Sequence, residues 1–368
     1  MSDVSSTGLL QAQALEHAFA LPAMLYRDAT WAQAERLSVF ARSWQLLGPA
    51  ERVAQPGDHL VGEIAGVPLL VVRGEDGVLR GLHNVCRHRA GPLALCDGRG
   101  ARSLRCRYHG WNYGLDGRLR TATDMADATG FRPQDIRLPE VPVMQWQGLV
   151  FAALDPRMDF AAWTQGIDVR LGARLAGYAF CRRVAYEVAC NWKVYVDNYL
   201  EGYHLPHVHP ALNRLLDYAS YRTEPARWHS LQWSPLDTAG AADAGAEGIY
   251  GEGEALYYFL WPNTMLNVLP GRLQTNRVIP LDTRRCRVEF DYYYPAAADA
   301  AEQARRKRDH TFSDEVQAED IAICEAVQRG LDSGSYEAGR LNPRRENGVH
   351  HFHELLRESL REAPHAAG

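Results

Sequence analysis

Two short groups of cysteine and histidine occur in the first half of the chain. Cys86 and His88 form a C-x-H group, and Cys106 and His109 form a C-x-x-H group after a gap of 17 residues. Each group follows a predicted strand, so each can lie in a tight loop that presents one thiolate and one imidazole. Two such loops facing each other supply two sulfur and two nitrogen ligands to a metal site.

Two metal sites use this ligand set. Zinc binds Cys2His2 in a tetrahedron, but its ligand pairs are normally separated by two to four residues, which makes C-x-H unusual for zinc. In a Rieske [2Fe–2S] cluster, two cysteines hold one iron and two histidines hold the other. The segment CRYHGW places a glycine and an aromatic residue after the ligand, which suits a tight loop over a cluster. The sequence favours the cluster, and we interpret Cys96, between the groups, as structural.

The stretch YLEGYHLPHVHP contains three histidines within six positions. His204 and His207 share one face of an intact helix, whereas His204 and His209 lie about 140° apart and converge only if the helix breaks. Pro206 and Pro210 can supply that break. The spacing alone leaves open which pair binds a metal.

A Rieske cluster moves single electrons, so another site must carry out the chemistry on a substrate. Two histidines and one carboxylate bind non-haem iron(II) and leave positions open for oxygen and substrate. The segment QAEDIAICEAVQRGL offers Glu319, Asp320 and Glu325 on one predicted helix. Because Glu319 and Asp320 point about 100° apart on a helix, only one can face the metal squarely. The alternative is a solvated acidic helix face.

The first part of the chain predicts a helix followed by strands. Apolar residues at helical spacing begin at Thr30, with Gln33 as the partner of a capping box. From about residue 44 the pattern changes to short strands, with Asp76-Gly77 and Asp116-Gly117 marking hairpin turns. Residues 44–155 are therefore predicted to form a compact all-β unit.

The remainder predicts a mixed region. A strand precedes a helix near Trp192, and two later segments rich in aromatic and β-branched residues read as strands. A long helix is expected from Ala298 to Leu331. The Ala/Gly-rich segment 236–250 is expected to be a mobile loop.

Composition narrows the class of protein. The chain has 368 residues, which suggests two or three domains, and a net charge of −5, which argues against a nucleic-acid or anionic-membrane surface. No apolar run approaches the ~20 residues of a membrane span, and no secretory signal is visible. Seven cysteines are an odd number for a disulfide framework. We expect a cytoplasmic enzyme that acts on a small molecule.

Both motif regions carry a resemblance to one family. CRHRAGPLALCDGRGARSLRCRYHGWNYGLDGRLR resembles the Rieske domain of the aromatic-ring-hydroxylating dioxygenase and choline-monooxygenase-like family of Rieske non-haem iron oxygenase alpha subunits. Respiratory-chain Rieske proteins add a second cysteine beside each ligand pair, whereas this chain has Gly91 there. NWKVYVDNYLEGYHLPHVHP is similar to the family's catalytic stretch. The resemblance extends from about Leu21 to Leu356.

The resemblance implies two cofactors, with O2 as co-substrate. It assigns the [2Fe–2S] cluster to four ligands and the mononuclear Fe(II) to three: Cys86, His88, Cys106 and His109, and His204, His209 and Asp320. His207 is then a bystander. Glu201 would connect the partner subunit's His109 with His204 and pass electrons between them. The family more often has aspartate at this position.

The family's fold implies an α+β protein with an all-β Rieske domain at 44–155. A helix-grip (START-like) catalytic domain with a large antiparallel sheet would occupy 156–368, with the helical segment 1–43 packed on it. Because the chain lacks a dinucleotide-binding fingerprint, electrons must come from a separate NAD(P)H-dependent reductase or ferredoxin. Relatives of this length often form homotrimers.

The expected reaction is hydroxylation of a small organic substrate, with an N-methylated or quaternary ammonium compound favoured. An aromatic acid that is dihydroxylated or O-demethylated is the alternative, and an electron carrier or a structural zinc protein are readings of a different class. Tyr257, Tyr258, Phe259 and Trp261 can contribute to an aromatic box for an N-methyl cation, or they can be sheet core. Only alternate residues of this run can face one cavity.

Overall fold

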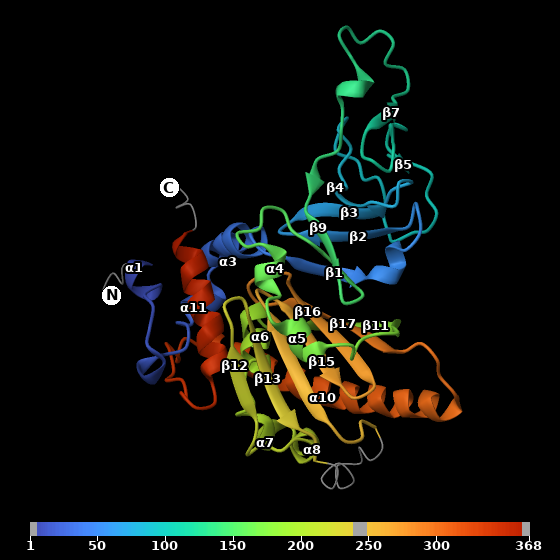
Figure 1. Ribbon diagram of the computed structural model, residues 1–368. Helices are drawn as coiled ribbons and strands as arrows, with labels where there is room; N and C mark the ends of the chain where they lie inside the picture. The colour runs from blue at the N-terminus through green and yellow to red at the C-terminus, as the bar shows by residue number, and fades with distance from the viewer. Residues whose placement is uncertain (1–5, 238–248, 363–368) are drawn as a thin grey trace. The chain divides into compact units, whose positions relative to one another are not determined.

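The computed structural model describes residues 6–237 and 249–362. The chain divides into two compact units, Phe40–Phe160 and a second unit made of Met1–Val39 with Ala161–Gly368 (Figure 1). Within the described residues, no helix is both long enough and apolar enough to cross a membrane. Most of the segment expected to be a loop at 236–250 lies outside the described residues.

The unit Phe40–Phe160 is built from three antiparallel sheets. Their strands are β1 (Gln45–Pro49), β10 (Leu149–Ala152) and β9 (Val143–Trp146) in the first, β2 (His59–Ile64), β3 (Val67–Arg73), β4 (Leu79–His83) and β8 (Glu140–Val141) in the second, and β5 (Leu104–Arg105), β6 (Asn112–Tyr113) and β7 (Leu119–Thr121) in the third. Both predicted hairpin turns are present, because Gly77 and Gly117 adopt the positive φ angles of 77° and 79° that glycine tolerates.

The second unit contains a seven-stranded antiparallel sheet. Its strand order is β11 (Tyr178–Val188), β17 (Cys286–Pro295), β16 (Arg272–Pro280), β15 (Thr264–Leu269), β14 (Glu254–Leu260), β13 (His229–Pro235) and β12 (Arg222–Pro225). The strands are joined mostly by hairpins, so neighbours in sequence are neighbours in the sheet. The predicted α+β class, with an all-β unit and a large antiparallel sheet, is confirmed.

One long helix packs across this sheet. α10 (Ala300–Asp332) begins where the Asp299 side chain accepts a hydrogen bond from the Glu302 N–H, and its predicted ends differ by no more than two residues. Side chains of α10 bond to strands at the β16–β17–β11 end, including Asp309 to Arg272 and Asp314 to Arg182. These bonds hold α10 against the sheet.

The N-terminal helical segment is tied to the second unit. α3 (Ala29–Glu35) packs near α6 (Trp192–Tyr199), where the buried Glu35 accepts hydrogen bonds from Lys193 at 2.5 Å and from the Trp192 indole at 2.7 Å. The predicted helix start was wrong by two residues. Asp28 is the N-cap, because its carboxylate accepts the Thr30 N–H at 2.7 Å.

The histidine-rich stretch folds as short helices, as its prolines suggested. α6 ends at Tyr199, α7 spans Leu205–Val208, and α8 spans Pro210–Leu215. Pro210 lies at an interruption of the helix, but Pro206 does not. It occupies the first turn of α7, where a proline costs no hydrogen bond because that N–H has no helical acceptor.

Candidate metal centres

Two loops of the β unit are closed by the same backbone hydrogen bonds. In the first loop, the Ala90 N–H donates to the Cys86 carbonyl at 3.0 Å and the Cys86 N–H donates to the Gly91 carbonyl at 2.8 Å. The fifth residue, Ala90, has a φ of 57°, which is uncommon for a residue with a Cβ.

The second loop repeats this arrangement 20 positions later. The Gly110 N–H donates to the Cys106 carbonyl at 3.0 Å, and the Cys106 N–H donates to the Trp111 carbonyl at 2.9 Å. Gly110 has a φ of 72° and takes the place of Ala90. The two loops are equivalent in backbone and differ in where the histidine stands, third in one and fourth in the other.

The loops lie against each other. A Cβ on Gly91 would come within 2.8 Å of the Cys106 sulfur, so only glycine permits this approach. The rings of His88 and His109 have centroids 4.6 Å apart. Cys86 and Cys106 are both buried and both free of disulfide bonds. The structure therefore brings together the four residues that the sequence proposed as cluster ligands.

Contacts around these residues suit a metal cluster. The Arg87 N–H donates to the Tyr113 hydroxyl at 3.0 Å, which leaves the hydroxyl hydrogen to donate to the Cys86 sulfur at 3.3 Å. The His88 ring stacks on Trp111 at 4.7 Å, and its Nδ1 atom is buried with no hydrogen-bond partner in the described part of the chain. A buried ring nitrogen without a partner is costly unless a ligand uses it. The residues present therefore fit the Rieske cluster.

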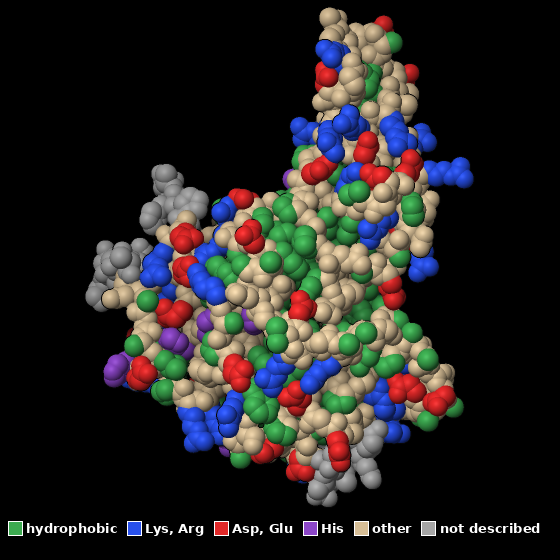
Figure 2. Space-filling model, in the orientation of Figure 1, with side chains coloured by type: hydrophobic (Ala, Val, Ile, Leu, Met, Phe, Trp, Pro, Cys, Tyr) green, Lys and Arg blue, Asp and Glu red, His purple; other side chains and the backbone are tan. Residues whose placement is uncertain are grey.

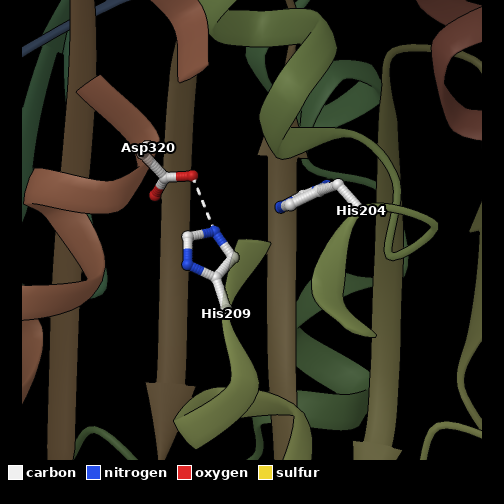
Figure 3. Close-up of side chains that lie close together, drawn as sticks. All are labelled: His204, His209 and Asp320. Carbon is white, nitrogen blue, oxygen red and sulfur yellow. Dashed lines mark hydrogen bonds and ion pairs between the residues drawn. The ribbon is translucent and has the colours of Figure 1, made fainter. Parts of the chain in front are cut away.

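A second group of ligands lies in the sheet-containing unit. His204 and His209 flank the single turn of α7, and Asp320 projects from α10 (Figure 3). Each residue offers one ligand atom, and the three atoms lie within 4.8 Å of one another. This group is a 2-His-1-carboxylate set of the kind that binds non-haem iron and leaves coordination positions open.

His209 is held between two carboxylates of α10. Its Nε2 lies 3.0 Å from Asp320 Oδ1 and its Nδ1 lies 2.7 Å from Glu319 Oε2. Burial acts to lower the pKa of His209, but the hydrogen bonds and charges of Asp320 and Glu319 outweigh it and raise the pKa. Asn198 donates to Asp320 Oδ1 at 2.6 Å and fixes the carboxylate from α6.

His204 is oriented by one glutamate. Glu201 Oε1 lies 2.6 Å from His204 Nδ1, and the other carboxylate oxygen accepts the backbone N–H groups of Tyr203 and His204. One ring nitrogen is thereby occupied, and Figure 3 shows the other directed toward His209 and Asp320. A carboxylate behind a ligating imidazole fixes its orientation and raises its basicity.

Other candidates from the sequence lie outside this group. His207 is exposed on α7, and Glu325 accepts the Ala189 N–H at 3.1 Å. The sequence offers Glu319 as an alternative ligand to Asp320. In the structure both carboxylates contact the His209 ring, Glu319 at Nδ1 and Asp320 at Nε2. Asn198 was missed, because nothing in its sequence context indicates that α6 will face α10.

A cavity of about 120 Å³ extends from the histidines between the sheet and α10. Five tyrosines line it: Tyr195, Tyr199, Tyr221, Tyr250 and Tyr257. Of the aromatic box proposed from the sequence, only Tyr257 lies on this wall. The prediction that Phe259 and Trp261 line the substrate site was wrong. Both pack in the core against Phe352 of α11 (Asn347–Arg361), with ring centroids 5.6 and 5.8 Å from that of Phe352.

Comparisons with known proteins agree with this geometry. Residues 43–142 match the Rieske [2Fe-2S] domain, and residues 175–362 match the ring hydroxylating alpha subunit (catalytic domain). Choline monooxygenase of Arabidopsis thaliana, a chloroplastic protein, is 35% identical over 364 residues, covering 94% of this chain and 84% of that protein. The carnitine monooxygenase oxygenase subunit of Escherichia coli K12 is 29% identical, covering 94% of this chain and 95% of that protein.

A solved structure shares the fold at nearly full length. The quaternary ammonium Rieske monooxygenase in complex with an inhibitor superposes with a TM-score of 0.85 at 25% identity, covering 95% of this chain and 99% of that chain. Naphthalene 1,2-dioxygenase of Rhodococcus has a TM-score of 0.77 at 18% identity, which shows the fold alone.

Paired Cys/His loops on one unit and a 2-His-1-carboxylate group on the other define a Rieske-type oxygenase component. The chain belongs to the family of Rieske non-haem iron oxygenase alpha subunits. It is an oxidoreductase whose domains imply a [2Fe–2S] cluster and a mononuclear iron that uses O2, and it requires a separate electron donor. Because both domains match, the electron-carrier and zinc-protein readings are set aside.

Proposed function

We propose that the protein oxidises a small N-methylated amine of the quaternary ammonium class. The observation that carries this proposal is the set of five tyrosines that line the cavity extending from His204 and His209. The face of an aromatic ring attracts a quaternary ammonium group through its quadrupole. Burial raises the pKa of Tyr257 to about 12, so its phenol stays neutral and can offer such a face. Relatives named for choline and carnitine support the same class.

In this proposal, Cys86, His88, Cys106 and His109 hold the cluster, and His204, His209 and Asp320 hold the iron. The buried, unpartnered Nδ1 of His88 supports the first assignment. The convergence of three ligand atoms within 4.8 Å supports the second. When bound, the two groups supply single-electron transfer and activation of dioxygen.

The chain's own residues position the reaction. Glu201 and Glu319 fix the imidazoles of His204 and His209 through Nδ1, which leaves Nε2 of each as the metal ligand. Leu212, Leu215 and Phe312 make the cavity wall apolar and keep water from the reacting methyl group. Asn198 holds the Asp320 carboxylate in place from the neighbouring helix.

We further propose a homotrimer in which Glu201 connects His204 with the partner subunit's His109. The sequence between Arg87 and Arg120 has eight arginines and two acidic residues, and all eight arginines are exposed. Several of the Lys and Arg side chains visible in Figure 2 lie on this β unit. Glu201, Asp197 and Glu346 line one cavity of the other unit and give it acidic character. Opposite charges of this kind favour docking of the two surfaces.

The proposed electron donor is a separate NAD(P)H-dependent reductase or a ferredoxin, with the protein working in the cytoplasm. The domain division proposed from the sequence, 1–43, 44–155 and 156–368, would give the cluster and the iron a domain each. The match of residues 43–142 to the Rieske domain supports the position of the first boundary.

A substrate screen tests the proposed function. Holoenzyme with a surrogate reductase is supplied with N-methylated amines or aromatic acids, and oxygen uptake, formaldehyde and diol products are measured. We expect substrate-dependent oxygen uptake with the amines. Formaldehyde release would identify N-demethylation, whereas a diol or an O-demethylated product from the aromatic acids alone would overturn the proposed class.

Variants of the histidines test the assigned roles in the same assay. His204→Ala is expected to lose one iron of about three per chain and its oxygen uptake. His207→Ala serves as the matched control, because His207 is exposed and lies outside the proposed ligand set. This variant should keep its full iron content and its oxygen uptake. If His204→Ala keeps its full iron content and oxygen uptake, the assignment is wrong.

A further inference from the structure

Strand β16 directs three polar side chains into the cavity. Arg272, Gln274 and Asn276 alternate along the strand, so they share one face, and all three line the cavity. Arg272 is 5% exposed. Arginine is seldom buried this deeply unless its charge is matched.

Among the residues that the structure describes, Arg272 has one acidic partner, Asp309, and that partner is shared. Its Nη1 donates to Asp309 Oδ1 at 2.8 Å. Asp309 also accepts hydrogen bonds from the hydroxyls of Tyr250 and Tyr294, each at 2.5 Å. The negative charge of Asp309 is therefore distributed over three donors.

Part of the Arg272 guanidinium is left unused. Its Nε is buried without a hydrogen-bond partner, and within residues 6–237 and 249–362 no acceptor bonds its Nη2. The guanidinium carbon lies 5.2 Å from the centre of the Tyr250 ring, a cation–π contact that helps to hold the group in place. A planar fork held in place with free N–H groups is suited to bidentate recognition of a carboxylate.

The opposite end of the cavity has the opposite charge. Glu201 and Asp320 line the cavity at the histidines, while Arg272 lines it next to Asp309. A cationic group would be favoured at the first end and an anionic group at the second.

Helix α10 sets the distance between these ends, because it carries both Asp309 and Asp320. Eleven residues of α-helix separate them by about 16 Å along the axis. Each ion pair or reacting contact takes up roughly 3–4 Å. Three such contacts leave on the order of 5 Å for the body of a bound molecule, which is the span of a short amino acid betaine.

We propose that Arg272 forms a carboxylate subsite and that the substrate is a zwitterion. Its N-methylated ammonium group lies at the His204–His209 end, and its carboxylate pairs with Arg272. This inference rests on the proposed function and narrows it, because an amino alcohol such as choline has no group for Arg272 to bind.

Matched substrates test the proposal without altering the protein. Anaerobic holoenzyme is titrated by calorimetry with glycine betaine, glycine betaine amide and choline, and the turnover of each is then measured. A charge-assisted bond is worth about 10- to 100-fold in affinity. We expect the carboxylate to bind tighter than the amide and choline by that factor.

Variants then locate the effect. Arg272→Gln is expected to bring the carboxylate-to-amide ratio of kcat/KM close to one, and Arg272→Lys, which keeps the charge but not the fork, to an intermediate value. Because Arg272→Gln leaves Asp309 buried without its partner, Arg272→Gln/Asp309→Asn removes both charges together. Arg183→Gln breaks another ion pair of the same sheet, to Asp291, away from the cavity, and should leave the ratio unchanged.

The outcomes separate the two proposals. Carboxylate preference in the wild type that disappears in the Arg272 variants supports the subsite. If the carboxylate and its amide bind equally, or if the preference persists without Arg272, the subsite is overturned while the amine oxidation proposal stands. If no N-methylated amine binds or is oxidised, the proposed function fails and the subsite fails with it.

Discussion

The two metal centres are positioned by different means. The four residues of the cluster loops lie within 24 positions of sequence, and the two loops are closed by the same pair of backbone hydrogen bonds. His209 and Asp320 are 111 positions apart, and side-chain carboxylates orient the histidines. One centre is therefore a product of local backbone geometry and the other of long-range packing.

This difference decides what each centre tolerates. Local loops hold their ligands as long as the chain can adopt the positive φ angles of Ala90 and Gly110 and the close approach at Gly91. The other centre depends on α6, α7 and α10 staying in register, and on side chains that stand behind the ligands. Changes can be chosen that affect one centre and spare the other.

Removing a ligand should have the largest effect and should separate the centres. Cys106→Ala is expected to lose the cluster, with two irons and its visible absorption. His204→Ala is expected to lose one iron and keep that absorption. Activity should fall in both variants by more than roughly 100-fold, the loss typical when a residue that orients a metal ligand is changed. Metal analysis with absorption spectroscopy measures this.

Cys96→Ala is the matched control for the cluster, because Cys96 is an exposed free thiol between the two loops. It should keep all irons. Loss of the visible absorption in His204→Ala would contradict independent positioning of the two centres.

Acid should act strongly on the unit that carries the His204–His209 centre. Burial lowers the pKa of His351 to about 4, below the ~6.5 of an unfolded histidine. The neutral form is thus favoured by folding, so this stability is present above pH 6.5 and is lost as the pH falls toward 4. The loss amounts to about 3 kcal/mol at most.

His351→Gln should therefore lose less stability than the wild type between pH 7 and pH 4.5. Denaturant unfolding at the two pH values measures the change, with His207→Gln as the exposed control. An unchanged pH dependence in His351→Gln would show that other groups cause the acid sensitivity.

Glu319→Gln tests the carboxylate behind His209. It should weaken iron binding at the second centre by about 10- to 100-fold, as is typical when a ligand loses its orienting partner, without loss of the cluster. Glu315→Gln changes an exposed glutamate on the same helix and serves as the control. Equal iron affinity in the two variants would mean that Glu319 does not orient His209.

The smallest effect is expected at the equivalent positions of the loops. Ala90→Gly should stabilise the β unit by about 1 kcal/mol, because a positive φ strains alanine. Gly110→Ala should destabilise it by about the same amount, since a Cβ there meets nothing closer than 3.4 Å and only the φ is unfavourable. Thermal unfolding of the two variants, which should shift in opposite directions, measures this.

The contrast also explains what could be predicted from the sequence. The cluster ligands were predictable because their spacing, their preceding strands and the glycines are all local. The hairpin turns and α10 were predictable for the same reason. Asp320 was identified by resemblance to a family, since an acidic helix face looks the same whether it meets a metal or solvent.

Features that depend on packing were not predictable. Tyr199, Tyr221 and Tyr250 reach the cavity from a helix end and from connecting segments, where no periodicity shows the direction of a side chain. The aromatic run after residue 256 was partly misread for a related reason: Tyr257 and Phe259 share a face of β14, but that face meets the cavity at one end and α11 at the other.

Helix α10 has a further consequence, because Asp309, Glu319 and Asp320 belong to one continuous element. A small shift of the helix along its axis moves both ends of the cavity together. Metal occupancy at one end and ligand binding at the other should then be energetically coupled, and linkage requires the coupling to be reciprocal. The factor by which iron changes the affinity for a ligand at Arg272 must equal the factor by which that ligand changes the affinity for iron.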